Sequence, residues 1–210
     1  MMYRDSLLLT GEKWSELDDN QKVEVLQTIE NHVAFESHRI PCPVFAKGLY
    51  TGTDGIVLGS YDPSNRVIYV NSTQFDSEAM YGKTSEDIIT ACLHEGRHAY
   101  QHQVADGMVI HDNPEEAEIW RNNLSEGNYI SFKENPRAYY NQPVEVDART
   151  FAKQRYIQLN TEREALAESD TERESSKDIF ERQMSCSDES DKMAASFLGN
   201  NIETNKYSVS

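Results

Sequence analysis

The sequence has no long hydrophobic run and little positive charge. Near the N-terminus only Leu7-Leu8-Leu9 is continuously apolar, whereas a signal peptide needs a longer apolar core and a membrane span about 20 apolar residues. We therefore expect no signal peptide and no membrane span. The expected location is the cytoplasm, with non-classical export as the alternative. Lysine and arginine number 20 against 36 acidic residues, a net charge of -16. This charge repels nucleic-acid phosphates and anionic lipids, so no nucleic-acid or membrane partner is expected.

Cysteine is also scarce. Cys42, Cys92 and Cys186 are odd in number and widely spaced, and they form no CxxC pattern. These features exclude a disulfide framework and are typical of reduced thiols. Cys42, which lies between two prolines, and Cys92, which lies two residues before His94, remain candidate metal ligands.

The chain is long enough for one domain with a hydrophobic core. Of its 210 residues, 38% are hydrophobic and 27% charged. We place a domain at residues 1–160 and a charged C-terminal extension at 161–210. The extension is rich in Glu, Arg and Ser, which allows a solvated helix or disorder, and its last part, 185–210, is expected to be disordered.

Periodicity predicts an α+β fold in which a small antiparallel sheet packs on helices. β-branched and apolar runs between 44 and 71 indicate two or three strands, with a turn at Asp62-Pro63-Ser64-Asn65. Thr84 and Asp87 fit a capping box at the start of a helix. Pro136 and Pro143 are expected to bracket a loop. The predicted helices cover 12–38, 84–104, 114–126 and 143–159.

The helix predicted after Thr84 carries the motif His94-Glu95-Gly96-Arg97-His98. A spacing of four puts both imidazoles on one helix face, where they can share a metal ion. In an HExxH arrangement the glutamate does not bind the metal but takes a proton from the attacking water. The motif therefore predicts a Zn²⁺ site with Glu95 as the general base.

A catalytic zinc site needs a third protein ligand. The metzincin pattern would require Gly at 101 and His at 104, and this chain has Gln101 and Val104 there, which excludes that family. The remaining possibility for the third ligand is a glutamate from a later helix. The candidates are Glu145 and, as a rival, Glu118.

Around Glu145 the chain reads Glu-Val-Asp-Ala-Arg-Thr-Phe-Ala. Together with HExxH this resembles gluzincin metallopeptidases, most closely those of the ImmA/IrrE type, whose second motif resembles ExEANxFA. The resemblance implies a zincin-like fold, zinc held by His94, His98 and Glu145, and hydrolysis of peptide bonds. It also implies an edge strand near the zinc that receives an extended peptide. Arg149 stands where the family has Asn or Asp, and Asp147 is the substitute expected to accept a histidine N–H.

Peptide hydrolysis also needs a donor for the developing oxyanion. Tyr140 is the predicted donor, with Tyr139 beside it as the other candidate. Two other readings stay open. The chain could be a non-catalytic, zinc-stabilised binding or regulatory module, or an exported effector or toxin protease. Neither the substrate nor the oligomeric state follows from the sequence.

Overall fold

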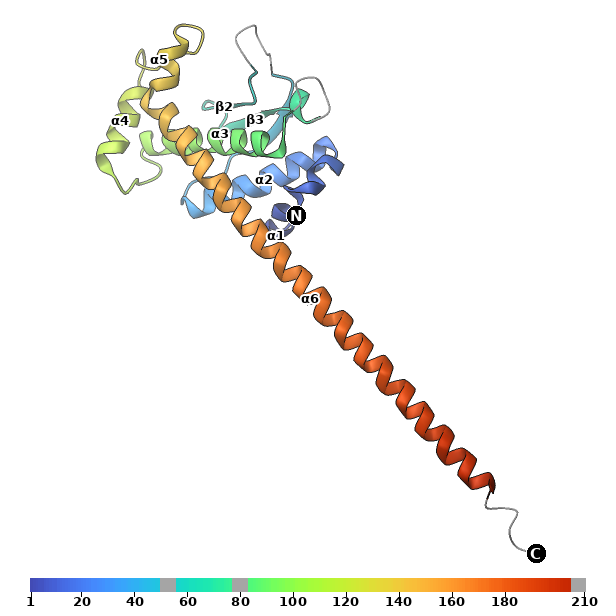
Figure 1. The fold of residues 1–210 in the computed structure, drawn as a ribbon. Coiled ribbons are helices and arrows are strands. Elements are labelled where there is room, and N and C mark those ends of the chain that lie inside the picture. The colour runs from blue at the N-terminus through green and yellow to red at the C-terminus, as the bar shows by residue number, and fades with distance from the viewer. Residues whose placement is uncertain (50–55, 77–82, 205–210) are drawn as a thin grey trace, which may run out of the picture. The chain divides into compact units, whose positions relative to one another are not determined.

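The computed structural model describes residues 1–49, 56–76 and 83–204 of the chain. It divides into two units, residues 1–164 and residues 165–210. The first holds the helices, the sheet and every candidate site residue, and the second continues the last helix. The fold class is α+β, mostly helical, with a small open sheet (Figure 1).

The N-terminal region differs from the single helix predicted at 12–38. It forms three elements, α1 (Tyr3–Leu9), the 3₁₀ helix η1 (Glu12–Glu16) and α2 (Asp19–Glu36). The break falls at Asp18, whose side chain accepts a hydrogen bond from the backbone N–H of Gln21 in a capping box. The expected apolar face of α2 is in the core, with Val25, Leu26, Ile29 and Val33 all buried.

The sheet is mixed, so the antiparallel prediction is wrong for one of its two pairings. Strands β1 (Val44–Lys47), β2 (Gly59–Asp62) and β3 (Val67–Asn71) lie in the order β1-β3-β2. β2 and β3 form the expected antiparallel hairpin, but β3 is parallel to β1. β3 carries the fully buried Ile68 and Val70, and it takes the central position, where both of its edges are paired. It thereby separates the two strands that precede it in sequence.

The predicted strand boundaries also need correction. The apolar run 56–58 precedes β2 and is not a strand. The run 48–50 lies after β1, and its last residue, 50, is outside the described residues. The turn after β2 is as expected, because the carboxylate of Asp62 accepts hydrogen bonds from the backbone of Ser64 and Asn65.

The later helices begin where the capping signals predict. α3 (Ser85–Ala105) has the Thr84–Asp87 capping box, and α4 (Pro114–Leu124) is capped by Asn113. The loop expected between Pro136 and Pro143 is instead a short helix, α5 (Pro136–Asn141). Its proline occupies the first helical position, and the Asn135 side chain caps it, a start signal that the loop prediction overlooked.

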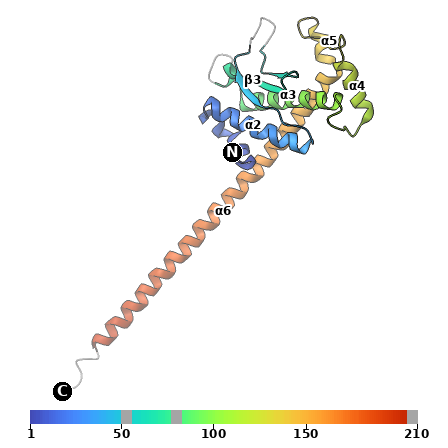
Figure 2. The same ribbon diagram turned by 180° about the vertical axis from the view of Figure 1, so that it is seen from behind.

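The last helix, α6 (Pro143–Thr204), begins at the predicted residue and is longer than predicted. Helices α2 and α3 pack against the sheet and each other, and the first turns of α6 cross α3 (Figures 1 and 2). Ala148 and Ala152 on α6 are fully buried, which permits this close crossing. Among the helices described, none has the length and apolar character needed to cross a bilayer.

Candidate metal centre

Helix α3 places the two histidines of the motif side by side. His94 and His98 are four residues apart, and their Nε2 atoms are 3.0 Å apart. The rings lie nearly perpendicular, at 88°. The capped, buried helix thus holds both imidazoles with their Nε2 atoms converging on one point.

The third member of the cluster comes from the first turn of α6. Glu145 is 1% exposed. Its Oε2 lies 3.3 Å from Nε2 of His94, and its Oε1 lies 3.4 Å from Nε2 of His98. The side-chain atoms of these three residues that could bind a metal all lie within 4.8 Å of one another. The structure therefore brings Glu145 to the two histidines, as expected.

These separations fit a metal ion. Tetrahedral zinc with bonds of about 2.0–2.1 Å requires its ligand atoms to be about 3.3 Å apart. The Nε2 atoms of His94 and His98 are 3.0 Å apart, and they lie 3.3 and 3.4 Å from the two different oxygens of Glu145. One ligand atom from each residue lies within 4.8 Å of the others, so the three side chains could hold one ion.

The charges of the cluster are complementary. Burial works to raise the pKa of Glu145, but hydrogen bonds with His94 and His98 outweigh it and hold the pKa well below its usual range. For His98, burial works to lower the pKa, and the contact with Glu145 outweighs it and raises the pKa. A proton therefore stays on the His98 imidazole more readily than in water, and a metal ion must displace it.

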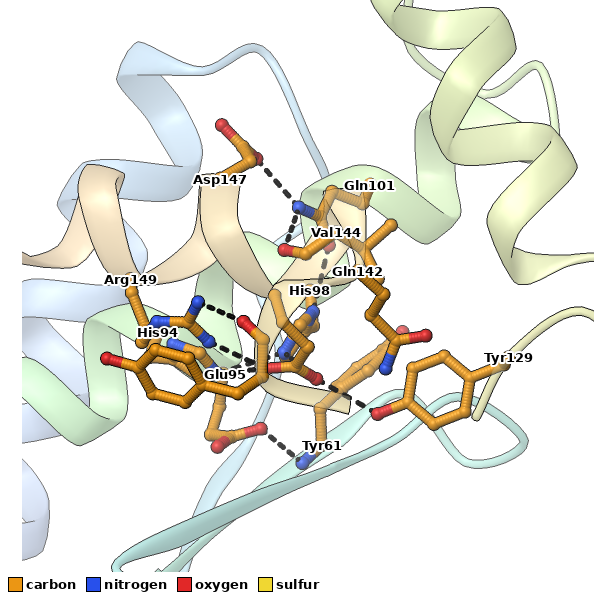
Figure 3. A network of polar contacts seen from close by, with 12 residues as sticks. Tyr61, His94, Glu95, His98, Gln101, Tyr129, Gln142, Val144, Asp147 and Arg149 are labelled. Carbon is orange, nitrogen blue, oxygen red and sulfur yellow. Dashed lines mark hydrogen bonds and ion pairs between the residues drawn. The ribbon is translucent and has the colours of Figure 1, made fainter. Parts of the chain in front are cut away.

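A buried glutamine fixes the tautomer of His98. The Nε2 of Gln101 donates to the carbonyl of Val144 at 2.9 Å and to Oδ2 of Asp147 at 2.7 Å (Figure 3). The amide oxygen of Gln101 must then face Nδ1 of His98, 2.8 Å away, which has to be the N–H donor. In the neutral ring, Nε2 consequently carries the lone pair and points it at Glu145.

Asp147 contacts His98 through Gln101, and not directly as predicted. It accepts hydrogen bonds from Nε and Nη2 of Arg97, at 2.8 and 3.1 Å, and from Gln101. The Arg97 guanidinium in turn lies over the rings of Tyr100, Trp120 and Phe151. A continuous network thus supports His98 and joins α3 to α6.

Two tyrosines reach the cluster of His94, His98 and Glu145, namely Tyr129 and the second predicted candidate, Tyr139. The hydroxyl of Tyr129, in the segment between α4 and α5, donates to Oε1 of Glu145 at 2.9 Å. The ring of Tyr139 packs edge-on against that of Tyr129. Tyr140 is 57% exposed, and its ring lies against the guanidinium of Arg149. The first predicted donor, Tyr140, therefore contacts Arg149, whereas Tyr129, which sequence reasoning missed, donates to Glu145.

Glu95 lies between the cluster of His94, His98 and Glu145 and the edge of the sheet. Its Oε2 accepts a hydrogen bond of 2.8 Å from the backbone N–H of Tyr61 on β2 (Figure 3). A Cβ at Gly59 would come within 2.8 Å of Cγ of Glu95, so only glycine permits this approach. The charge of Glu95 also helps to raise the pKa of His98, although burial of the ring and the Glu145 hydrogen bond act more strongly. The Glu95 carboxylate therefore acts electrostatically on the His98 imidazole.

The other candidate ligands lie elsewhere. Glu118 is paired with Arg121 on the surface of α4. Cys42 and Cys92 are buried free thiols, and within the described residues neither joins the metal-binding cluster. His111 contacts Tyr100 and Glu116. Cys186 lies outside the residues whose side chains are described.

Comparison with protein-family models, curated proteins and solved structures finds no match to this chain. The functional argument therefore depends on the geometry of the site.

Of the residues that sequence reasoning missed, Gln101 left a usable signal. It follows His98 by three residues, a spacing that places both on one face of the helix, and a glutamine on a buried face needs partners. Tyr129 left none, because it lies in an irregular segment whose position depends on the folded chain.

Proposed function

We propose that this chain is a zinc-dependent peptidase. The observation that carries the proposal is the convergence of His94, His98 and Glu145, whose ligand atoms lie within 4.8 Å of one another, with the motif glutamate Glu95 held beside them by the Tyr61 N–H. A structural site would have no need of that extra carboxylate.

The donor set favours zinc over magnesium or calcium. Two imidazole nitrogens and one carboxylate form a set that catalytic zinc uses, whereas magnesium and calcium prefer oxygen ligands. Structural zinc sites are closed by a fourth ligand, often cysteine. Cys42 and Cys92 lie outside the cluster, which supports an open site over the non-catalytic alternative.

A bound zinc ion would supply Lewis acidity and lower the pKa of a water molecule at the open position. Glu95 would take one proton from that water as its oxygen adds to the peptide carbonyl carbon. It would pass the proton to the amide nitrogen as the C–N bond breaks, which leaves a carboxylic acid and an amine, and the acid then gives its proton to the amine or to solvent. The hydrogen bond from the Tyr61 N–H keeps the Glu95 carboxylate at the edge of the sheet.

A peptide substrate is supported by the position of β2. Among the described strands it lies at the edge of the sheet and pairs with β3 alone, and its backbone contacts Glu95 directly. An extended peptide can add to such an edge through main-chain hydrogen bonds. The scissile bond would then lie near the metal.

The metal site is tested by zinc content after purification, measured by mass spectrometry on the full chain. We expect about one zinc ion per chain in the wild type and loss of zinc in His94→Ala and Glu145→Gln. Glu118→Gln is the matched control, because Glu118 is a surface glutamate outside the cluster, and it should keep its zinc. A wild type without zinc, or loss in Glu118→Gln instead of Glu145→Gln, would refute this site.

Catalysis is tested separately with Glu95→Gln. This variant should retain zinc but lose cleavage of an unstructured peptide library, with products identified by mass spectrometry. Equal cleavage by Glu95→Gln and wild type would rule out the base assignment. Zinc binding without any cleavage by the wild type would leave the non-catalytic alternative as the better reading.

A further inference from the structure

Arg149 brings a positive charge to the edge of the metal centre. It lies one turn after Glu145 on α6, and its Nη1 is 3.9 Å from Oε2 of that carboxylate. The same oxygen is 3.3 Å from Nε2 of His94. The guanidinium therefore lies next to a metal-binding atom, at a position where the resembling family carries a neutral or acidic side chain.

Tyr140 holds this guanidinium in place. The ring centroid of Tyr140 is 3.7 Å from Cζ of Arg149, and the carbonyl oxygen of Tyr140 accepts a hydrogen bond from Nη2. The hydroxyl of Tyr140 takes part in neither contact. Arg149 is thus oriented in advance, and its side chain keeps 28% exposure to solvent.

The local charge differs from that of the whole chain, whose net charge is -16. Asp147 is paired with Arg97, and Glu145 would be neutralised by a bound dication. Glu95 is engaged by the N–H of Tyr61. Arg149 is then a cation fixed beside Glu145, and its planar fork of donors suits a carboxylate or a developing oxyanion.

We propose that Arg149 is the anion-binding residue of this site and contacts a negatively charged substrate oxygen beside the metal. That oxygen has two sources, the scissile carbonyl as it gains charge or a carboxylate carried by the peptide. Tyr140, which the sequence suggested as the donor, is a positioning residue for Arg149. The inference rests on the metal centre of the proposed function.

The test measures anion binding to the Co²⁺-loaded full chain, with acetate as the probe and the visible cobalt absorption as the signal. Arg149→Met should weaken acetate binding by at least tenfold at unchanged cobalt content, and Arg149→Lys should fall between it and the wild type. Arg155→Met is the matched control, because Arg155 lies on the same helix and pairs with Glu36 at 2.6 Å, outside the site. It should bind acetate as the wild type does.

Tyr140→Phe separates the guanidinium from the hydroxyl, because the ring under Arg149 remains. It should weaken acetate less than Arg149→Met does. An equal loss would assign the anion contact to the hydroxyl and overturn the proposal. Unchanged acetate affinity in cobalt-loaded Arg149→Met would overturn the role of Arg149 alone. A wild type that binds no metal would overturn the metal centre itself.

Steady-state kinetics then distinguish the two sources of the oxygen. If Arg149 contacts the scissile carbonyl, Arg149→Met lowers kcat for every cleaved peptide. If it contacts a substrate carboxylate, KM rises for peptides with a free C-terminus or an acidic side chain and stays constant for amidated, uncharged ones. Unchanged kcat and KM for both peptide classes would refute both roles.

Discussion

Replacing Gln101 by methionine should weaken metal binding without touching a ligand. The change keeps the length of the side chain but removes the acceptor for Nδ1–H of His98, a hydrogen bond of 2.8 Å. Loss of such an outer contact costs about 10–100-fold in metal affinity, which corresponds to about 1.4–2.8 kcal/mol. The carbonyl of Val144 and Oδ2 of Asp147 also lose a donor, but Asp147 keeps its hydrogen bonds from Arg97. The Nδ1–H of His98 loses its partner, and a buried group left unpaired costs about 1–3 kcal/mol of folding free energy.

Gln103 offers a matched control on the same helix. It is 2% exposed, and its side chain makes two hydrogen bonds, 2.9 and 3.0 Å long, with the backbone of Ile40. Gln103→Met should therefore lower the free energy of unfolding by a similar amount, about 1–3 kcal/mol for each unpaired group. It should leave the metal affinity unchanged.

The assay is competition for Zn²⁺ with a chromophoric chelator, together with urea unfolding of the metal-free proteins. The reasoning fails if Gln101→Met binds zinc as tightly as the wild type. It also fails if both variants lose affinity equally, because the effect would then reflect general destabilisation of α3 and not the tautomer of His98.

Three further outcomes are expected. Gly96→Ala would place a Cβ 2.8 Å from Oε2 of Glu30, in a buried ion pair, and should lower the urea-unfolding free energy by about 1–3 kcal/mol; an unchanged midpoint would contradict this. Gly59→Ala should displace the Glu95 carboxylate and lower kcat while zinc content stays constant. Metal affinity should fall as pH decreases, because protons compete for the imidazoles, and the raised pKa of His98 starts the decline at a higher pH than for free histidine; titrations at several pH values would check this.

The parts of the fold that could be predicted depend on local signals. The start of α3 followed from Thr84 and Asp87, which make their capping box within four residues. The metal-binding face followed from the spacing of His94 and His98. Glu145 is distant in sequence and was proposed only because its own segment resembled a second motif.

The remaining features depend on contacts between distant segments. The parallel pairing of β1 with β3 arises because the most buried strand takes the centre of the sheet, which strand propensity alone does not specify. Tyr129 reaches Glu145 only through the folded path of residues 125–135. The role of Arg149 depends on where the Tyr140 ring lies, and sequence order places Tyr140 nine residues earlier.

The two histidines and Glu145 belong to helices that the chain forms separately, α3 and α6. An ion bound by all three would act as a cross-link that closes the whole segment between them, including α4 and α5. Binding to the folded state alone stabilises a protein by about 2.7 kcal/mol when the free ligand is at 100 times its Kd. The melting temperature should therefore rise with zinc concentration and fall on chelation. Resistance to unfolding and to proteolysis would then depend on the supply of the metal.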